Sequence, residues 1–305
     1  MNKSLKVLIS VINWNNNAAT SACLASIAKI LKADQPDIYL TDNNSETQEL
    51  ALDQQITDTL RSIKIVFNTV NKGFAGGHND AITYALQNNY EYICLLNNDA
   101  EILDKLVFKN LTIALEQNYL AVGAAPTILS RTDPPTIWFG GGTMNINKAT
   151  TQHDNLGKIY SPNSNKKSQN VNFLTGCCLM ISLKDKSLDL LLNEEYFLYW
   201  EDADWCARML KNDKQLLYVP STFLLHHTSS SLGVRSPSYG YYNVRNRLLF
   251  AKKWSSSKLV VFGCTWTGFK IIGLSLKRPS TAFKTIWYIK RALFDGVKGN
   301  TGPLK

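Results

Sequence analysis

Apolar and amphipathic segments alternate along the first 126 residues of the chain. Short apolar runs rich in β-branched residues predict five buried strands, at Leu5–Asn13, Ile38–Asp42, Ile63–Asn68, Tyr92–Asn97 and Ala121–Pro126. Helical spacing of apolar positions predicts helices between them, at Ala18–Ala33, Thr47–Arg61, Asn79–Asn89 and Asp104–Gln117. This alternation predicts an α/β fold with a mostly parallel central sheet flanked by helices.

Unusual polar motifs stand where three of these strands end. Asn13–Asn15 follows the first strand, Asp42–Ser45 the second, and Asn97-Asn98-Asp99 the fourth. Open parallel sheets bind their ligands at the carboxyl ends of the strands. We therefore expect the functional site at this edge of the sheet.

The alternation stops after Pro126. The apolar segments Phe173–Ser182 and Leu216–Leu225 predict further strands, and the second runs directly into His226-His227. Tyr196–Trp200 leads into an acidic group, Glu201-Asp202-Ala203-Asp204, that opens a helix ending near Lys211.

Charge is distributed unevenly along the 305 residues. Residues 235–305 carry 14 Lys and Arg against one acid, a net charge of +13, whereas residues 1–234 carry 19 basic and 23 acidic residues, a net charge of −4. A basic tail of this kind favours phosphates, anionic lipid or nucleic acid. Within it, Leu259–Leu276 is apolar but interrupted by Lys270, which fits an interfacial helix better than a transmembrane one. The alternative is a helical appendage that packs on the body and has a solvated basic face.

Six cysteines occur without any C-x-x-C pair, so their spacing does not indicate a zinc site. Most of them lie in apolar stretches, and no secretory signal precedes the first strand. We expect reduced, buried thiols and a cytoplasmic protein, peripheral at the inner face of the cell membrane if the tail binds lipid.

Carboxylates at strand ends and helix starts can bind sugar hydroxyls, hold Mg²⁺ or Mn²⁺, or act as a general base. Asp42, Asp99 and the acidic group at 201–204 all have such positions, although each alone could simply cap a helix. The glycine-rich segment 71–79 would let backbone approach a ligand closely, or form a tight loop before a helix. It matches neither a P-loop nor a dinucleotide-binding fingerprint.

The motifs as a set resemble the family 2 glycosyltransferases, and most closely their bacterial rhamnosyltransferase-like branch. The matching segments span Val7 to about Phe250 and follow the family's order: Asn13-Trp14-Asn15, Thr41–Ser45, Asn71–Asn79, Leu95–Asp99, Phe173–Gly176, Phe197–Asp204, His226 and Tyr242–Asn246. The resemblance implies a GT-A fold and transfer of a sugar, with inversion, from a nucleotide-diphosphate donor.

The resemblance also implies roles for individual residues. Asp202 would be the catalytic base, with Glu201 as the alternative, and Asp99 and His226 would hold Mg²⁺ or Mn²⁺, with His227 as the alternative ligand. The residues implied in donor binding, chiefly Asp42 at the nucleoside, are Asn13, Asn15, Asp42, Asn44, Lys72, Gly73, Asn79, Asn97 and Asn98. Those implied at the acceptor or at phosphates are Gly176, Asp204, Arg245 and Asn246. The first position of the metal motif, often Asp in GT-A enzymes, is Asn97 here.

We expect the GT-A domain to cover residues 1–230, with a nucleotide-binding half at 1–126 and an acceptor half at 127–230, followed by a basic, aromatic helical tail at 231–305. The implied partners are a nucleotide-sugar donor, with dTDP-rhamnose favoured by the branch, and a saccharide or lipid-linked acceptor of the cell envelope. A glycosyltransferase of this kind is not expected to bind nucleic acid. Two other classes remain open: a nucleic-acid-binding α/β protein, suggested by the basic tail, and a sugar nucleotidyltransferase, which would release pyrophosphate.

Overall fold

The computed structural model describes most of the chain. The described ranges are 6–30, 36–47, 54–60, 62–162, 167–227, 236–255 and 279–304, together with the single residues Gly263, Thr265, Gly268, Phe269 and Gly273. The predicted interfacial helix Leu259–Leu276 and Cys264 therefore lie largely outside the described residues. No helix within the described ranges is long and apolar enough to span a membrane.

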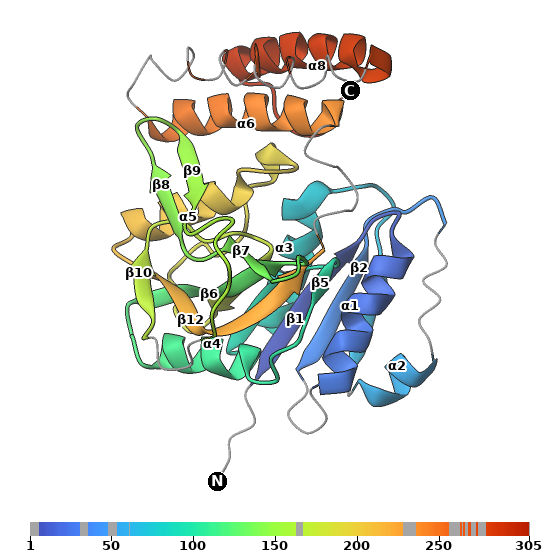
Figure 1. Cartoon of the computed structure of the whole chain (residues 1–305), viewed down its shortest axis with the longest axis vertical. Helices are drawn as coiled ribbons and strands as arrows, with labels where there is room; N and C mark the ends of the chain where they lie inside the picture. Colours follow the sequence, from blue (N-terminus) through green and yellow to red (C-terminus); the bar gives the residue numbers. More distant parts are fainter. Residues whose placement is uncertain are drawn as a thin grey trace.

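Helices and strands alternate in the first half of the chain, and strands dominate the middle (Figure 1). The strands are β1 (Val7–Asn13), β2 (Asp37–Asp42), β3 (Ile63–Phe67), β4 (Tyr92–Asn97), β5 (Ala100–Glu101), β6 (Ala121–Ser130), β7 (Thr136–Phe139), β8 (Gly142–Asn145), β9 (Thr150–His153), β10 (Gln169–Val171), β11 (Cys178–Ser182) and β12 (Gln215–His226). The helices are α1 (Asn17–Ile30), α2 (Gln54–Thr59), α3 (Gly73–Gln87), α4 (Val107–Glu116), the 3₁₀ turn η1 (Glu194–Tyr196), α5 (Glu201–Lys211), α6 (Pro237–Trp254) and α8 (Pro279–Lys298).

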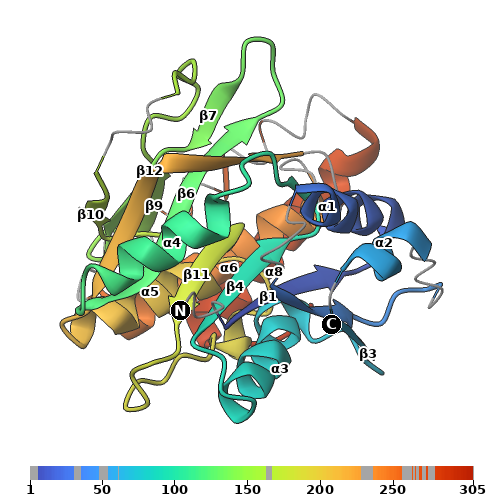
Figure 2. The same ribbon diagram turned by 90° about the horizontal axis from the view of Figure 1, so that it is seen from below.

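The central sheet has the order β10-β12-β6-β11-β4-β1-β2-β3, with β5 paired to β12 and β7 to β6. β1 pairs in parallel with both β2 and β4, β2 pairs in parallel with β3, and β12 pairs in parallel with β6. β11 lies between β4 and β6 and is antiparallel to both. Helices cover both faces, because Ser10 of β1 contacts α3 while Asn13 contacts α1 (Figure 2). The expected mostly parallel α/β sheet is confirmed, with one antiparallel strand in its interior.

Register brings the strand-end motifs together at one edge. Asn13 lies opposite Asp42 on β2, and Ile12 lies opposite Asn97 on β4. Several boundaries differ from expectation: β11 begins at Cys178, not at Phe173, and β6 continues beyond Pro126 to Ser130. The largest difference is in α3, which begins at Gly73, not at Asn79. The glycine-rich segment is therefore the first turn of the helix, since Gly73 with φ 70° turns the chain directly into it.

The two tail helices that the structure describes, α6 and α8, stack on the body, with α6 between the body and the outermost α8 (Figure 1). Tyr242 of α6 stacks on Phe197, and Phe250 packs on Trp200. A Cβ at Gly296 of α8 would lie only 2.7 Å from Leu248 of α6, so the two helices approach closely. A domain boundary near residue 230 stays a prediction, and α6 makes a substantial contribution to the core of the body.

The five described cysteines, Cys23, Cys94, Cys177, Cys178 and Cys206, are free and buried. Burial raises the pKa of the Cys23 thiol, which keeps it protonated and unreactive. The expectation of buried thiols is confirmed for these residues.

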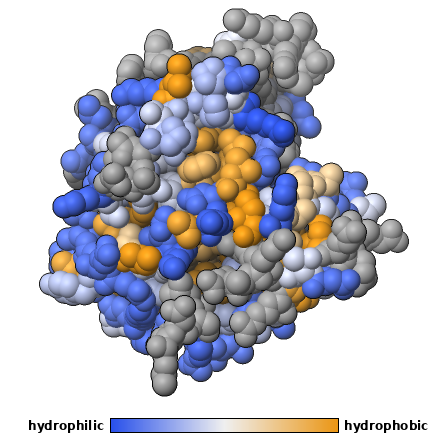
Figure 3. Space-filling view, turned by 60° about the horizontal axis from the view of Figure 1, so that its bottom comes forward, coloured by the Kyte–Doolittle hydropathy of each residue, from blue (hydrophilic) through white to orange (hydrophobic). Residues whose placement is uncertain are grey.

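The surface mixes apolar and polar patches. On the face in Figure 3, apolar side chains gather near the middle and hydrophilic ones surround them.

Candidate active site

The loop after β2 is built around the buried carboxylate of Asp42. Asn13 Nδ2 donates to Asp42 Oδ2 at 2.7 Å, while the Ser45 hydroxyl and backbone N–H donate to its two oxygens at 2.8 and 2.9 Å. Asn13 and Asp42 are fully buried, so they fix the shape of the two strand-end loops. Asn15 and Asn44 are exposed on these loops, both with left-handed backbone (φ 52° and 64°). Their amides are therefore open to solvent, although Asn15 Oδ1 also accepts from Glu46 N at 2.8 Å.

Asn43 is a structural hub that sequence reasoning did not single out. Its Nδ2 donates to Gly73 O at 2.9 Å and to Asn71 Oδ1 at 3.0 Å. Its Oδ1 accepts from Lys72 N at 3.0 Å and from Asn68 Nδ2 at 3.1 Å. Both amide hydrogens and both lone pairs are therefore used to tie β2 to the start of α3. The only feature of the sequence that could have indicated this role is the position of Asn43 within the polar motif Asp42–Ser45 at the end of a strand.

The glycine-rich segment 71–79 and the segment Phe197–Asp204 touch each other at Gly73. The Phe74 N–H donates to the Phe197 carbonyl at 2.8 Å. A Cβ at Gly73 would stand 2.1 Å from the same carbonyl oxygen, closer than atoms can approach. Glycine is needed here both for the positive φ and for the room, so this segment cradles the loop before α5.

Lys72 and Asn79, both expected at the donor, contact protein groups. Lys72 Nζ lies 2.6 Å from Asp80 Oδ2 in a half-exposed ion pair. The Asn79 amide accepts from Leu192 N at 2.8 Å and donates to Leu192 O and Glu194 Oε1, each at 2.9 Å. Asn79 is buried, so it anchors the segment leading to α5 in place of the expected donor contact.

A carboxylate and an imidazole meet at the end of β4. The pairing of β12 with β5 sets His226 opposite Ala100, and His226 Nε2 lies 3.0 Å from Asp99 Oδ1. The ring of Trp138 packs edge-on against His226, with centroids 4.6 Å apart. His227 points to a different partner, Glu101 Oε2 at 2.8 Å. Of the two histidines, His226 is therefore the one beside Asp99.

The donor set of Asp99 and His226 fits a divalent cation only in part. No group of three His, Cys, Asp or Glu side chains that could hold a metal occurs among the described residues. One carboxylate oxygen and one imidazole nitrogen are nevertheless suitable ligands, and His226 Nδ1 has no hydrogen-bond partner in the described part of the chain. Asn97 Nδ2 lies 3.5 Å from His226 Nε2, and Asn98 donates to Thr20 Oγ1. An ion here would need further ligands from water and a diphosphate.

Two adjacent carboxylates open α5, and their surroundings differ. Asp202 Oδ1 accepts from Ala203 N at 2.8 Å and Oδ2 from Gly176 N at 3.1 Å. Glu201 is buried, and its Oε2 has no partner among the described residues. Burial raises the pKa of Glu201 well above its usual range, and the neighbouring Asp202 raises it further. Burial also raises the pKa of Asp202, but its backbone hydrogen bonds oppose that rise.

The turn at Gly176 and Cys177 connects the carboxylates that open α5 to the pair of Asp99 and His226. Gly176 N holds Asp202, while the Cys177 carbonyl accepts from Asn97 N at 2.9 Å. Asn97 is two residues from Asp99, so both groups belong to one edge of the sheet. A Cβ at Gly176 would stand 2.9 Å from the Phe74 ring, which explains the need for glycine.

Asp204, Arg245 and Asn246 face the protein interior, not an acceptor or phosphate. The Asp204 carboxylate is fully buried and bound by Tyr196, Arg208, Lys253 and Trp254. Arg245, 1% exposed, stacks near Tyr241 and Tyr242 and donates to the carbonyls of Tyr196 and Gly302. Asn246 Nδ2 lies 2.7 to 2.8 Å from the carbonyls of Tyr196, Leu198 and Tyr199. This is a correction to the expectation: Arg245 and Asn246 donate to the loop before α5, and the Asp204 carboxylate accepts hydrogen bonds from the side chains around it.

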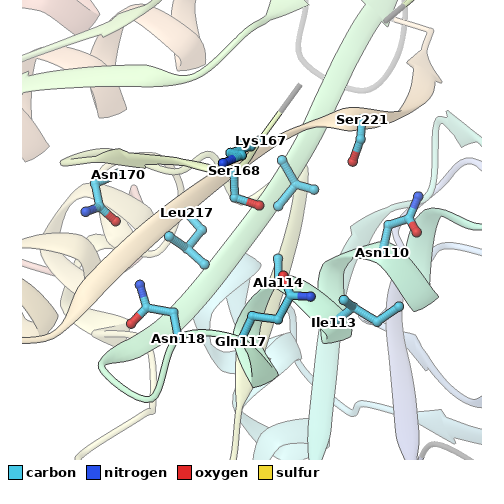
Figure 4. A pocket seen from close by; sticks show the side chains of 11 residues that line it. Asn110, Ile113, Ala114, Gln117, Asn118, Lys167, Ser168, Asn170, Leu217 and Ser221 are labelled. Atoms are coloured by element: carbon cyan, nitrogen blue, oxygen red, sulfur yellow. The ribbon is translucent and has the colours of Figure 1, made fainter. Parts of the chain in front are cut away.

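A separate cavity of about 580 Å³ lies between α4 and the strands β10 and β12 (Figure 4). Its walls carry several amides, including Asn110, Gln117, Asn118 and Asn170. None of its lining residues is among the expected site residues, so it is distinct from the edge described above.

Comparison with known sequences gives a consistent assignment. The family model of glycosyl transferase family 2 matches residues 8–186, more than half of the chain. The low-salt glycan biosynthesis hexosyltransferase Agl10 of Haloferax volcanii is 26% identical over 242 residues, 76% of this chain and 75% of that protein. The dTDP-rhamnosyl transferase RfbF of Shigella flexneri is 23% identical over 289 residues, 89% of this chain and 90% of that protein.

Comparison with solved structures addresses the fold. GalNAc-T7, solved with UDP, GalNAc and Mn²⁺, superposes with a TM-score of 0.60 at 13% identity; all of this chain is covered, but it spans only 60% of that chain. The mannosyltransferase PcManGT from Pyrobaculum calidifontis, solved with GDP-Man and Mn²⁺, gives 0.59 at 9% identity, covering 97% and 88%. These neighbours confirm the expected GT-A fold. With the family match over residues 8–186, more than half of its length, the chain belongs to glycosyl transferase family 2.

Proposed function

We propose that this protein is an inverting, metal-dependent glycosyltransferase that moves a sugar from a nucleotide-diphosphate donor to a saccharide or lipid-linked acceptor in cell-envelope polysaccharide synthesis. One observation carries the proposal. The Asp99–His226 pair and the Asp202 carboxylate are tied together through the Gly176–Cys177 turn at the carboxyl edge of the sheet. Such an edge is where open α/β sheets bind ligands.

The donor would lie along the loops after β1, β2 and β4. Asn15 and Asn44 offer exposed amides for the nucleoside, on loops whose shape is set by the buried Asn13 and Asp42. Lys72 is half-exposed and supplies a positive charge nearby once it leaves Asp80.

Asp99 and His226 would hold Mg²⁺ or Mn²⁺, which supplies positive charge that stabilises a diphosphate leaving group. The neutral Asn97 makes this site less negative than one with two carboxylates, so we expect weak metal binding without the donor. The Mn²⁺ bound to GalNAc-T7 and PcManGT supports a divalent ion.

Asp202 would act as the general base. The acceptor oxygen bonds to the anomeric carbon as the bond from that carbon to the diphosphate oxygen breaks, and the acceptor proton passes to Asp202. One displacement inverts the anomeric carbon and leaves a nucleoside diphosphate. Backbone hydrogen bonds from Gly176 and Ala203 aim the carboxylate and favour its ionised form.

Rhamnose from dTDP-rhamnose is the donor we favour, because the similarity to the dTDP-rhamnosyl transferase RfbF extends over 89% of the chain. Structural neighbours are solved with other donors, GDP-Man in PcManGT and UDP-GlcNAc in S. aureus TarS. The fold alone therefore does not determine which nucleotide the donor carries.

The test is thermal stabilisation by a panel of nucleoside diphosphates and nucleotide sugars, with and without Mg²⁺ or Mn²⁺. Ligands that bind the native state raise the melting temperature. We expect a metal-dependent shift with one nucleotide, and release of that nucleoside diphosphate on turnover. Release of pyrophosphate would instead identify a nucleotidyltransferase, and the absence of any shift would contradict the proposal.

A further inference from the structure

The outermost helix, α8, has two faces of different character. α8 packs on α6, and its inner face carries small and apolar residues, among them Ala282, Thr285, Ile289 and Ala292, all buried. The only acid of the helix, Asp295, is buried as well and is bound by Arg291, Tyr241 and Asn300. The inner face is therefore complete without any further partner.

The outer face is apolar too, which is unusual for a helix with water on that side. Phe283, Trp287, Phe294 and Val297 are 84%, 49%, 52% and 54% exposed and follow one another along a single stripe. The remaining exposed side chains between residues 282 and 298 are all lysines: Lys284, Lys290 and Lys298. Exposed aromatic stripes of this kind mark interaction sites.

The lysines stand among the rings. Lys298 Nζ lies 4.6 Å from the Phe294 ring centroid, and Lys284 Nζ lies 5.6 Å from that of Tyr288. No ion pair recorded between described residues involves Lys284, Lys290 or Lys298. The stripe thus combines large apolar side chains with uncompensated positive charge and exposes no acid.

We propose that this face of α8 docks on an anionic lipid bilayer, with the helix lying parallel to the membrane surface. The aromatic rings would enter the boundary between headgroups and acyl chains, while the lysines would reach the anionic headgroups. Because lysines occur along the length of the helix, it cannot cross the bilayer. The three exposed lysines of α8 match a negative surface. A soluble polyanion would need only this charge, whereas the apolar stripe fits a lipid bilayer.

The orientation follows from the stack of helices. α6 separates α8 from the body, so the sheet and its catalytic edge would stand above the membrane (Figure 1). The docking face does not include any catalytic or donor-binding candidate, and it can be altered without touching them.

The experiment is co-sedimentation of the full-length protein with vesicles of phosphatidylcholine alone or with about 30% phosphatidylglycerol. We expect binding only to the anionic vesicles at low salt, lost as salt rises because exposed charges are screened. Phe283→Ser combined with Trp287→Ser and Phe294→Ser should weaken binding at least tenfold. Tyr119→Ser, at a ring 90% exposed on the body, is the matched control and should bind as the unchanged protein does.

Charge is tested separately with Lys284→Glu, Lys290→Glu and Lys298→Glu in one chain. The control carries the same change in charge on the body, at the exposed Lys29, Lys105 and Lys109. Only the α8 variant should lose binding, while both keep the melting temperature and nucleotide-induced shift of the unchanged protein. Equal loss in both variants, equal binding to neutral vesicles, or a lipid-free dimer abolished by Trp287→Ser would overturn the proposal.

Discussion

Glu201 and Asp202 are adjacent carboxylates whose protonation differs because their surroundings differ. Asp202 receives two backbone N–H groups, which favour its charge, whereas Glu201 has a buried oxygen without a partner among the described residues. Burial and the neighbouring Asp202 both raise the pKa of Glu201. We therefore expect Asp202 to be the more acidic of the two and Glu201 to be the carboxyl that keeps its proton.

This difference predicts opposite outcomes for two nearly identical substitutions. Asp202→Asn removes the base, so kcat should fall by about 10² to 10⁴ with the donor-induced thermal shift retained. Glu201→Gln imitates a neutral acid and should keep kcat within about tenfold of the unchanged enzyme. Steady-state kinetics with nucleoside-diphosphate release checks both. If Glu201→Gln were the inactive variant, Glu201 would be the base.

The two histidines offer a second matched pair. His226 lies 3.0 Å from Asp99 Oδ1, while His227 is paired with Glu101. We expect His226→Ala to raise the Mn²⁺ concentration needed for half-maximal thermal stabilisation with nucleotide by about tenfold or more, the usual order for loss of a supporting ligand. His227→Ala should leave it unchanged. A larger effect at His227 would transfer the ligand role to that residue.

At this scale, residue types and strand ends predicted the positions of the site, but not the partner of each side chain. Asp204 shares a motif with Asp202, yet it is buried beneath α6 and bound by Lys253 and Trp254. Those partners are about 50 positions away along the chain, and sequence spacing contains no sign of them. Arg245 was misjudged for the same reason.

Among the elements, the loop before α5 is the most constrained. Phe197, Tyr199 and Trp200 all have positive φ, between 63° and 76°, which is uncommon for bulky residues. Asn246 of α6 binds three carbonyls of residues 196–199. This loop ends where the acidic pair of Glu201 and Asp202 begins, so we expect Asn246 to position Asp202.

We expect Asn246→Ala to lower kcat by about tenfold to a hundredfold with a smaller change in KM, because a slight misplacement of Asp202 suffices. The lost hydrogen bonds should also cost about 2 to 3 kcal/mol of stability. Asn243→Ala on the same helix is the control, since its amide reaches only Tyr239 O at 3.4 Å. Equal kinetic effects at both positions would show that Asn246 does not aim the loop.

The start of α3 supports the same loop from the other side. Gly73 and Gly157 both have positive φ, 70° and 79°, but a Cβ at Gly157 would meet nothing within 4 Å. Gly157→Ala should cost roughly 1 to 2 kcal/mol from backbone strain alone. Gly73→Ala adds a clash with Phe197 O, so denaturant unfolding should show a larger loss, accompanied by a fall in kcat. Equal losses would contradict the packing role.

The alternation of apolar and amphipathic segments was sufficient to predict the order of the first strands and helices and the sheet they form. A strand was predicted where β11 lies, but its antiparallel direction was not. The direction depends on how the chain returns from β10, and the periodicity of apolar residues contains no information about that path. The start of α3 was placed six residues late because glycines were read as loop-forming. Here one glycine turns the chain into the helix, and Gly76 and Gly77 pack tightly inside it.

The packing of the whole molecule includes the tail, although the tail's basic charge alone indicated only a segment that binds anions. Tyr242 and Phe250 of α6 cover Phe197 and Trp200, and Lys253 and Trp254 bind the buried Asp204. Beyond α8, the chain returns to the body, where Gly302 N donates to Glu195 O and Leu304 N to the Tyr242 hydroxyl. The body, the tail helices and the last residues therefore form one packed unit.

Two shortened chains test this unity. Ending the chain after Ser230 would leave Asp204 buried without two of its partners, a loss of several kcal/mol, and would expose the aromatic rings beneath α6. We expect that chain not to unfold cooperatively in urea. Ending it after Lys298 removes the hydrogen bonds of the last residues, among them those of Asn300 with Asp295, of the Gly302 carbonyl with Arg245 and of Leu304 N with the Tyr242 hydroxyl. This should cost several kcal/mol but leave a cooperatively folded, active enzyme of lower stability. A stable, active 1–230 chain would instead make α6 a dispensable appendage, and the carbonyl contacts of Asn246 could not then be what aims Asp202.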